Sequence, residues 1–228
     1  MKATLASLIV AAAGLACAVP ASAQESNTVR AGIYIIQYHA HADDLSGPFA
    51  PSGLNVDLKN VNTVYFAYIR RLTSYLDLEL AGGWPPKTET VGKGPATVGS
   101  VPYDGQVIAT SKWFSPTLLL NYKIGPESWP VRPYIGAGIN YTHFYDRTST
   151  AAGNAVAGGP TKVSLSDSIG PAGTIGVFYR ITPQWSIDGS FSMARVRSDL
   201  EANTSGAIRK TTIDFKPTAW VLSAGYSF

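Results

Sequence analysis

The chain has 228 residues, enough for one domain of barrel size or two smaller ones, and only 14% of them are charged. Soluble domains usually carry about 25% charged residues, so the composition indicates that water is not the main solvent around this protein. Without Lys2, which lies in an N-terminal leader, 17 basic residues stand against 15 acidic ones. This near balance, with no basic run interleaved with aromatic residues, argues against nucleic acid as a partner.

The first 23 residues predict a secretory signal peptide. Lys2 supplies a positive start, the residues after it are almost all small and apolar, and Pro20 ends that run. Ala21-Ser22-Ala23 fits a small-x-small cleavage site, so we expect cleavage after Ala23 and a single mature domain over residues 24–228. Cys17 is the only cysteine and lies inside the leader, so the mature protein cannot rely on disulfides.

Alternation with a period of two is the main structural signal after the leader. No segment is apolar for the ~18 residues that a membrane helix requires, and no 3.6-residue periodicity is sustained. What recurs instead is a run of about ten alternating residues bounded by turn-forming residues. The runs lie near 28–39, where the phase is ambiguous, and at 61–70, 72–81, 112–123, 132–145, 170–181, 185–193 and 220–228.

The run at 132–145 has two unlike faces. Its apolar face carries Pro133, Ile135, Ala137, Ile139 and Tyr141. Its other face is polar or small, with Arg132, Tyr134, Gly136, Gly138, Asn140 and Thr142. In a soluble sandwich the apolar face would point to a core, whereas in a transmembrane barrel it would point to lipid and the polar face to a lumen. Periodicity alone does not choose between these folds.

The lengths of the connections favour the transmembrane barrel over the soluble sandwich. Short connections lie near 71–73, 125–131 and 182–184, and longer polar ones of roughly twenty residues lie at 39–60, 84–111, 146–167 and 195–212. Outer-membrane barrels combine short periplasmic turns with long extracellular loops. We therefore predict an all-β fold, an eight-stranded antiparallel transmembrane β-barrel with both termini in the periplasm. A soluble β-sandwich is the alternative.

Three segments of the chain resemble the OmpW (outer membrane protein W) family. Arg132-Pro-Tyr-Ile-Gly-Ala-Gly-Ile-Asn-Tyr141 is similar to the most distinctive strand of that family, and Ser168-Ile-Gly-Pro-Ala-Gly-Thr-Ile-Gly-Val177 to its next strand. The ending Trp220-Val-Leu-Ser-Ala-Gly-Tyr-Ser-Phe228 also matches, and the resemblance is specific from about Pro116 onward. It implies a narrow, largely apolar channel that passes small hydrophobic molecules through the outer membrane of a Gram-negative bacterium. The terminal Phe228 is the residue that such barrels present to the barrel assembly machinery.

The predicted lumen has a charged half and an apolar half. Eight strands leave an interior just wide enough for side chains to fill, which argues against a general aqueous pore. The inward charged positions all fall in the periplasmic half: Asp77, Glu79, Arg132, Arg180 and Asp188. Buried charges need partners, so we predict a salt-bridged plug that sends an apolar solute sideways into the outer-membrane lipid. The alternative is a cluster that only fills the barrel and sets its register.

Above the plug we expect a lumen of apolar and small residues. The expected lining comprises Leu119, Tyr134, Gly136, Gly138, Asn140 and Phe178. The glycines would leave room for a neighbouring large side chain that also points into the lumen.

Other motifs favour neither a cofactor nor an enzyme. His39-Ala-His41-Ala-Asp43-Asp44 has the spacing of metal ligands, but a solvated loop is the simpler interpretation. Gly136-Ala-Gly-Ile-Asn-Tyr141 begins like a dinucleotide fingerprint, ends in Tyr and precedes no helix. A Gly-x-Ser-x-Gly elbow is absent and the chain has only three histidines. The alternative to transport is a structural or interaction barrel whose extracellular loops bind a partner, a phage or a surface.

Overall fold

The computed structural model describes residues 26–50, 53–95, 97–98 and 101–228. The predicted signal peptide, residues 1–23, lies outside these ranges, so its boundary stays a prediction. Within the described ranges no helix is long and apolar enough to span a membrane.

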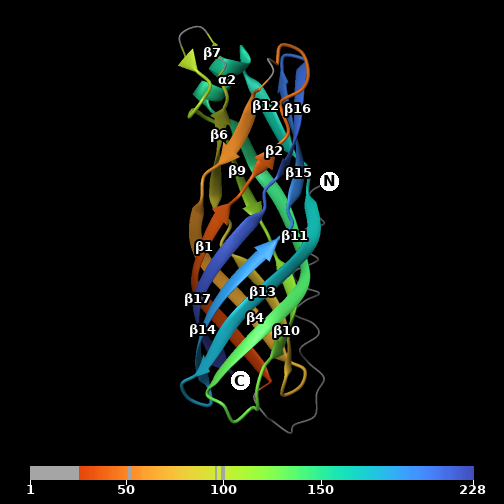
Figure 1. Cartoon of the computed structure of the whole chain (residues 1–228). Coiled ribbons are helices and arrows are strands. Elements are labelled where there is room, and N and C mark those ends of the chain that lie inside the picture. The colour runs from red at the N-terminus through yellow and green to blue at the C-terminus, as the bar shows by residue number, and fades with distance from the viewer. Residues whose placement is uncertain (1–25, 51–52, 96, 99–100) are drawn as a thin grey trace, which may run out of the picture.

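Eight antiparallel strands close into a barrel (Figure 1). Each strand pairs with the next one in chain order, and the last pairs back with the first. The barrel strands are β1 (Asn27–Tyr38), β4 (Val61–Arg71), β5 (Leu76–Gly83), β10 (Thr117–Lys123), β11 (Val131–Ser149), β13 (Ser168–Arg180), β14 (Trp185–Ala194) and β17 (Pro217–Ser227). The predicted fold class is confirmed.

Two predicted strands start later than expected or are interrupted in the structure. The run expected over 72–81 starts only at Leu76, because the amides of Leu72 and Thr73 both donate to the Leu76 carbonyl and close a turn. The run expected over 112–123 is interrupted at Pro116, which has no amide hydrogen to donate to a sheet.

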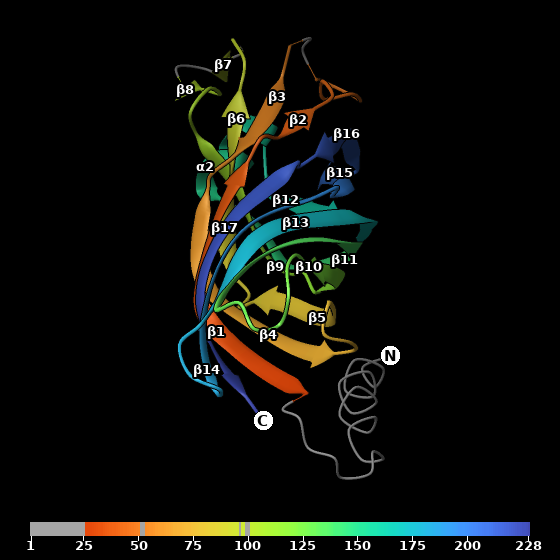
Figure 2. The same ribbon diagram turned by 60° about the horizontal axis from the view of Figure 1, so that its bottom comes forward.

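The long connections are not the polar loops that we expected. They form a structured crown above the barrel (Figure 2). Its elements are β2 (His41–Ala42), β3 (Asn55–Leu58), β6 (Lys87–Lys93), β7 (Thr97–Val98), β8 (Val101–Pro102), β9 (Val107–Phe114), α2 (Ala151–Ala157), β12 (Thr161–Leu165), β15 (Arg197–Thr204) and β16 (Ala207–Asp214). Strands β9, β6 and β3 extend the barrel sheet from β11, and β12, β15, β16 and β2 form a second sheet.

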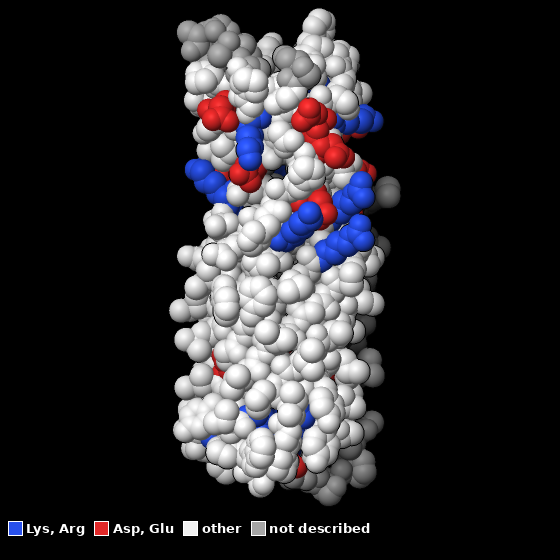
Figure 3. Space-filling view, viewed as in Figure 1, with Lys and Arg blue, Asp and Glu red and all other residues white. Residues whose placement is uncertain are grey.

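The outer face of the barrel is apolar. In β11, Ile135 and Ile139 are 56% and 59% exposed, while the alternate residues Tyr134 and Asn140 are buried. Charged side chains gather on the crown and leave a broad uncharged band over the barrel strands (Figure 3). The apolar face of the run at 132–145 is therefore the outer, lipid-facing side of the wall.

An apolar cluster lies at the junction between barrel and crown, and part of it lines the space inside the barrel. It joins Ile36 and Ala219 of the barrel to Leu200 and Ile213 of the crown sheet. Phe144 of β11 stacks on Phe215 with ring centroids 5.2 Å apart. We call this cluster the apolar junction.

Candidate functional site: the barrel lumen

A buried cluster of charges crosses the lumen near the short turns. Arg30 on β1 lies between two carboxylates, with its Nη1 3.7 Å from Glu79 Oε2 and 3.3 Å from Asp188 Oδ2. The three side chains are at most 4% exposed. Lys123 on β10 makes a second buried ion pair, with its Nζ 2.5 Å from Asp77 Oδ2. These five residues are the ion-pair cluster.

Neutral side chains add hydrogen bonds and a ring contact to the ion-pair cluster. Glu79 accepts hydrogen bonds from Tyr65 Oη at 2.5 Å and from Asn121 Nδ2 at 2.6 Å. Asp188 accepts one from Tyr134 Oη at 2.9 Å. The ring of Phe178 lies 4.8 Å from Lys123 Nζ, a cation–π distance. Charge pairing and hydrogen bonding of this kind are what buried ions require.

The structure brings three of the five predicted plug residues into this cluster. Asp77, Glu79 and Asp188 belong to it, but Arg132 and Arg180 do not supply its positive charge. Arg132 Nη2 donates to the Gly125 carbonyl at 2.9 Å, and Arg180 Nη2 donates to the Glu127 carbonyl at 3.0 Å. Both arginines sit at strand ends, so their side chains reach the turn carbonyls at the rim.

The sequence did not predict the two cations of the cluster, Arg30 and Lys123. The phase of the first run was ambiguous because both of its faces are rich in apolar residues. One signal in the sequence could have settled it: Arg30, Gly32 and Tyr34 alternate with Val29, Ala31 and Ile33, and the structure turns the first set inward. Lys123 is the last residue of its run, where the alternation is a weak guide to which face a side chain occupies.

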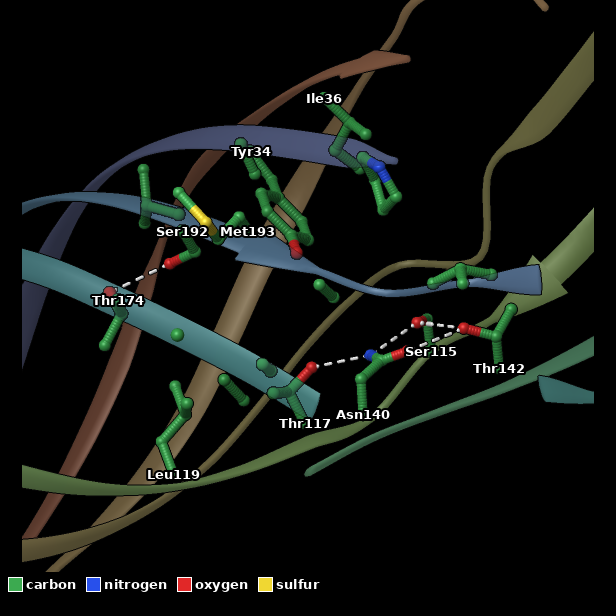
Figure 4. A pocket seen from close by; sticks show the side chains of 18 of the residues that line it. Tyr34, Ile36, Ser115, Thr117, Leu119, Asn140, Thr142, Thr174, Ser192 and Met193 are labelled. Carbon is green, nitrogen blue, oxygen red and sulfur yellow. Dashed lines mark hydrogen bonds between the residues drawn. The ribbon is translucent and has the colours of Figure 1, made fainter. Parts of the chain in front are cut away.

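Above the cluster lies a cavity with one polar and one apolar wall (Figure 4). On the polar wall, Asn140 Nδ2 donates to Ser115 Oγ and Thr117 Oγ1, both at 2.8 Å. The apolar side carries Tyr34, Ile36, Ala219 and Val221 from β1 and β17. We call this space the lumen cavity; it holds about 810 Å³ between atoms, including its open part.

The expected upper-lumen residues divide between the two levels. Leu119 and Asn140 line the lumen cavity as expected. Tyr134 and Phe178 lie lower, against the ion-pair cluster, so their placement in the upper lumen was wrong.

Glycine is required at the two inward positions of β11 for different steric reasons. A Cβ at Gly136 would lie 1.9 Å from Asn121 Oδ1, so this glycine makes room for a lumen side chain, as expected. A Cβ at Gly138 would lie 1.8 Å from the backbone oxygen of Leu118. Gly138 therefore permits close approach of two strands and does not open lumen space, which corrects our expectation.

The wall of the lumen cavity is thin between β13 and β14. Its lining includes Gly173 and Met193, which face one another in the pairing of these strands. Both belong to the outward-facing phase of their strands, and Met193 is 55% exposed. The inward neighbours are the small residues Ala172 and Ala194. At this place the paired backbones of the two strands and small side chains separate the cavity from the outer face.

The histidine motif at the start of the crown does not assemble a metal site. His39, His41, Asp43 and Asp44 are all exposed. Asp44 accepts a hydrogen bond from the Gly53 amide at 3.2 Å. Within the described residues, no three His, Cys, Asp or Glu side chains gather as metal ligands do.

Comparison with known proteins gives one consistent group. The family model described as "OmpW family" matches residues 24–228. Outer membrane protein W of Vibrio cholerae is 25% identical over 230 residues, covering 100% of both chains. The dibenzothiophene metabolism operon protein PahQ of Pseudomonas aeruginosa is 32% identical over 135 residues, 57% of this chain and 58% of PahQ. The crystal structure of OprG from Pseudomonas aeruginosa superposes with a TM-score of 0.78 at 21% identity, over 90% of this chain and 96% of OprG.

Proposed function

Because the chain belongs to the OmpW family and is a barrel of the Gram-negative outer membrane, we propose that it takes up small hydrophobic molecules and releases them sideways into the bilayer. The solute enters through the crown, passes the apolar junction, reaches the lumen cavity and leaves between β13 and β14. No catalytic step and no cofactor take part.

One relationship carries this proposal: the lumen cavity ends below on buried charges but borders the outer face at Gly173 and Met193. An apolar molecule that continued downward would have to displace ion pairs from their partners, which costs several kcal/mol per uncompensated charge. The sideways path meets small and apolar side chains and requires the paired backbones of β13 and β14 to separate locally. The charge cluster thus favours lateral exit over straight passage.

The name of one relative supports the solute class. PahQ is named for an operon of dibenzothiophene metabolism, and dibenzothiophene is an apolar aromatic compound. The mainly apolar wall of the lumen cavity suits a molecule of this kind, and the hydroxyl groups of the opposite wall are already hydrogen-bonded to one another and to Asn140.

Two outward glycines allow a matched test of the exit. A Cβ at Gly173 meets only the Gly136 oxygen, at 3.7 Å, and a Cβ at Gly189 meets nothing within 4 Å, so both positions accept a side chain. Gly173 borders the lumen cavity, while Gly189 lies farther down the same pair of strands. We expect Gly173→Phe to lower uptake of a radiolabelled aromatic hydrocarbon to the level of cells lacking the protein, and Gly189→Phe to leave it unchanged. Equal uptake by cells with and without the wild-type protein would contradict transport itself.

The crown supports a second candidate function, an interaction barrel. It is built from paired strands and carries most of the charge on the face shown in Figure 3, as a surface that binds a partner or a phage would. This function predicts that uptake does not depend on the protein, whereas removal of crown charges such as Lys59 and Glu89 abolishes adhesion or phage adsorption.

A further inference from the structure

The crown encloses a second cavity, which we call the crown cavity. It holds about 870 Å³ between atoms, part of which is open to solvent. Most of its lining is apolar and includes Leu54, Val56, Ile108, Val163, Leu200 and Ala202. Among the described residues of the lining, Arg209 is the only one with a charged side chain.

Arg209 occupies an inward position on β16. It is 9% exposed and lies opposite Ala202 of β15 in the sheet. The next pair along, Lys210 and Glu201, points to the outside and forms its own salt bridge at 3.2 Å. The carboxylate nearest in the sheet is therefore turned away from Arg209 and already paired.

The contacts of the Arg209 guanidinium are all with neutral oxygens. Its Nε donates to the Pro48 carbonyl at 3.1 Å. Its two Nη atoms both reach the Ala157 carbonyl at 3.4 Å, and Nη1 also lies 3.5 Å from Thr204 Oγ1. The last three distances exceed the 2.7–3.2 Å of well-formed N–H···O bonds. Within the described part of the chain, no carboxylate forms an ion pair with this side chain.

A buried cation without an anion is an unfavourable arrangement unless a partner arrives. The planar fork of a guanidinium binds carboxylates through two parallel hydrogen bonds. The rest of the crown cavity offers apolar surface with few competing polar groups. The missing partner is thus an anionic oxygen group attached to an apolar body.

We propose that the crown cavity captures amphiphiles with a terminal carboxylate, such as medium-chain fatty acids. Arg209 holds the carboxylate, and the apolar lining covers the hydrocarbon chain. The inference rests on the proposed function in taking the crown as the entrance, and it adds a preference for anionic over neutral amphiphiles at that entrance.

Equilibrium binding tests this preference without requiring transport. We would titrate decanoate and decanol, at pH 8, into the full-length protein in lipid nanodiscs, with empty nanodiscs as the blank. A charge-assisted hydrogen-bonded pair should make decanoate bind about ten-fold more tightly than decanol. Arg209→Gln should abolish this difference while decanol still binds. Lys210→Gln, which removes a neighbouring cation on the outer side of the same strand, should preserve it.

Two further variants keep the test decisive. Arg209→Lys retains the charge and should retain a decanoate preference. Ala202→Trp fills the crown cavity without removing its charge and should weaken both ligands. Equal binding of decanoate and decanol by the wild-type protein, or an intact preference in folded Arg209→Gln, would overturn the proposal. If Arg209→Gln does not fold, unchanged decanoate binding by Ala202→Trp would overturn it. If the wild-type protein prefers decanoate but Gly173→Phe does not lower hydrocarbon uptake, the binding site stands and only the proposed exit route is refuted.

Discussion

Arg30 reaches Asp188 across an intervening strand, with 3.3 Å between Nη1 and Oδ2. The two residues lie on β1 and β14, and β17 runs between them. The contact is possible because Gly225 and Ser223, the inward residues of β17 at this level, are small. A Cβ on Gly225 would lie 3.3 Å from Arg30 Cγ and 2.6 Å from Ser186 Oγ. The small residues of β17 thus leave the space through which the ion-pair cluster spans the lumen.

Removal of Arg30 should destabilise the barrel strongly. Arg30→Met leaves Glu79 and Asp188 buried without their cation, and loss of one partner from a buried ion pair costs about 3–5 kcal/mol. Urea unfolding in lipid vesicles, followed by tryptophan fluorescence, measures the change. Arg71→Met is the matched control, because Arg71 and Glu127 pair at the rim with side chains 32% and 35% exposed. Exposed pairs contribute roughly 0–1 kcal/mol. Similar losses for both variants would show that the cluster is not a special source of stability.

The ion-pair cluster should also seal the lumen. We expect the triple variant Arg30→Ala, Glu79→Ala, Asp188→Ala to raise single-channel ion conductance in planar bilayers, because it removes both the side-chain volume and the pairing that close the lower lumen. The control replaces three exposed, lipid-facing residues, Ile33, Ile135 and Leu222, by alanine. Unchanged conductance in the first variant would leave the cluster a role only in filling and registering the barrel.

Alanine at three glycines should give graded losses of stability. Gly138→Ala forces its Cβ against the Leu118 backbone and should cost the most, about 1–3 kcal/mol or more. Gly136→Ala displaces the flexible Asn121 side chain and weakens its bond to Glu79, a loss of about 1–3 kcal/mol. Gly189→Ala has open space and should stay within about 0.5 kcal/mol. Chemical unfolding ranks the three, and a Gly189 variant as unstable as the others would refute the steric explanation.

We propose that the barrel assembly machinery recognises the end of β17. The Phe228 side chain is 56% exposed, while its backbone exchanges hydrogen bonds with Asn27 at 2.9 and 3.1 Å. Phe228→Ala should therefore leave the unfolding free energy of the purified barrel nearly unchanged but reduce the folded fraction in cells. Heat-modifiable migration on gels reports that fraction. Phe66→Ala, at another exposed aromatic of the wall, should not reduce it; an equal fall in both would point to lipid contact instead.

The sequence by itself determined the wall of this protein. Alternation in runs such as 132–145 assigns Ile135 and Ile139 to one face and Asn140 to the other, because a strand has a period of two. The same periodicity places Asp77, Glu79 and Asp188 inside, and the alternation of connection lengths indicates a barrel. These properties are local, so they can be inferred without knowing which strands are neighbours across the lumen.

Only the tertiary structure decided how the inward residues meet. The pairing of Arg30 with Asp188 depends on the stagger of the closed barrel and on the small residues of β17 between them. The periodicity of a single strand reveals neither the stagger nor which strand lies between the two residues. The crown likewise depends on contacts between segments far apart in the chain, as where Arg209 of β16 meets Ala157 of α2. The cation of the crown cavity is therefore visible only once the chain has closed around it.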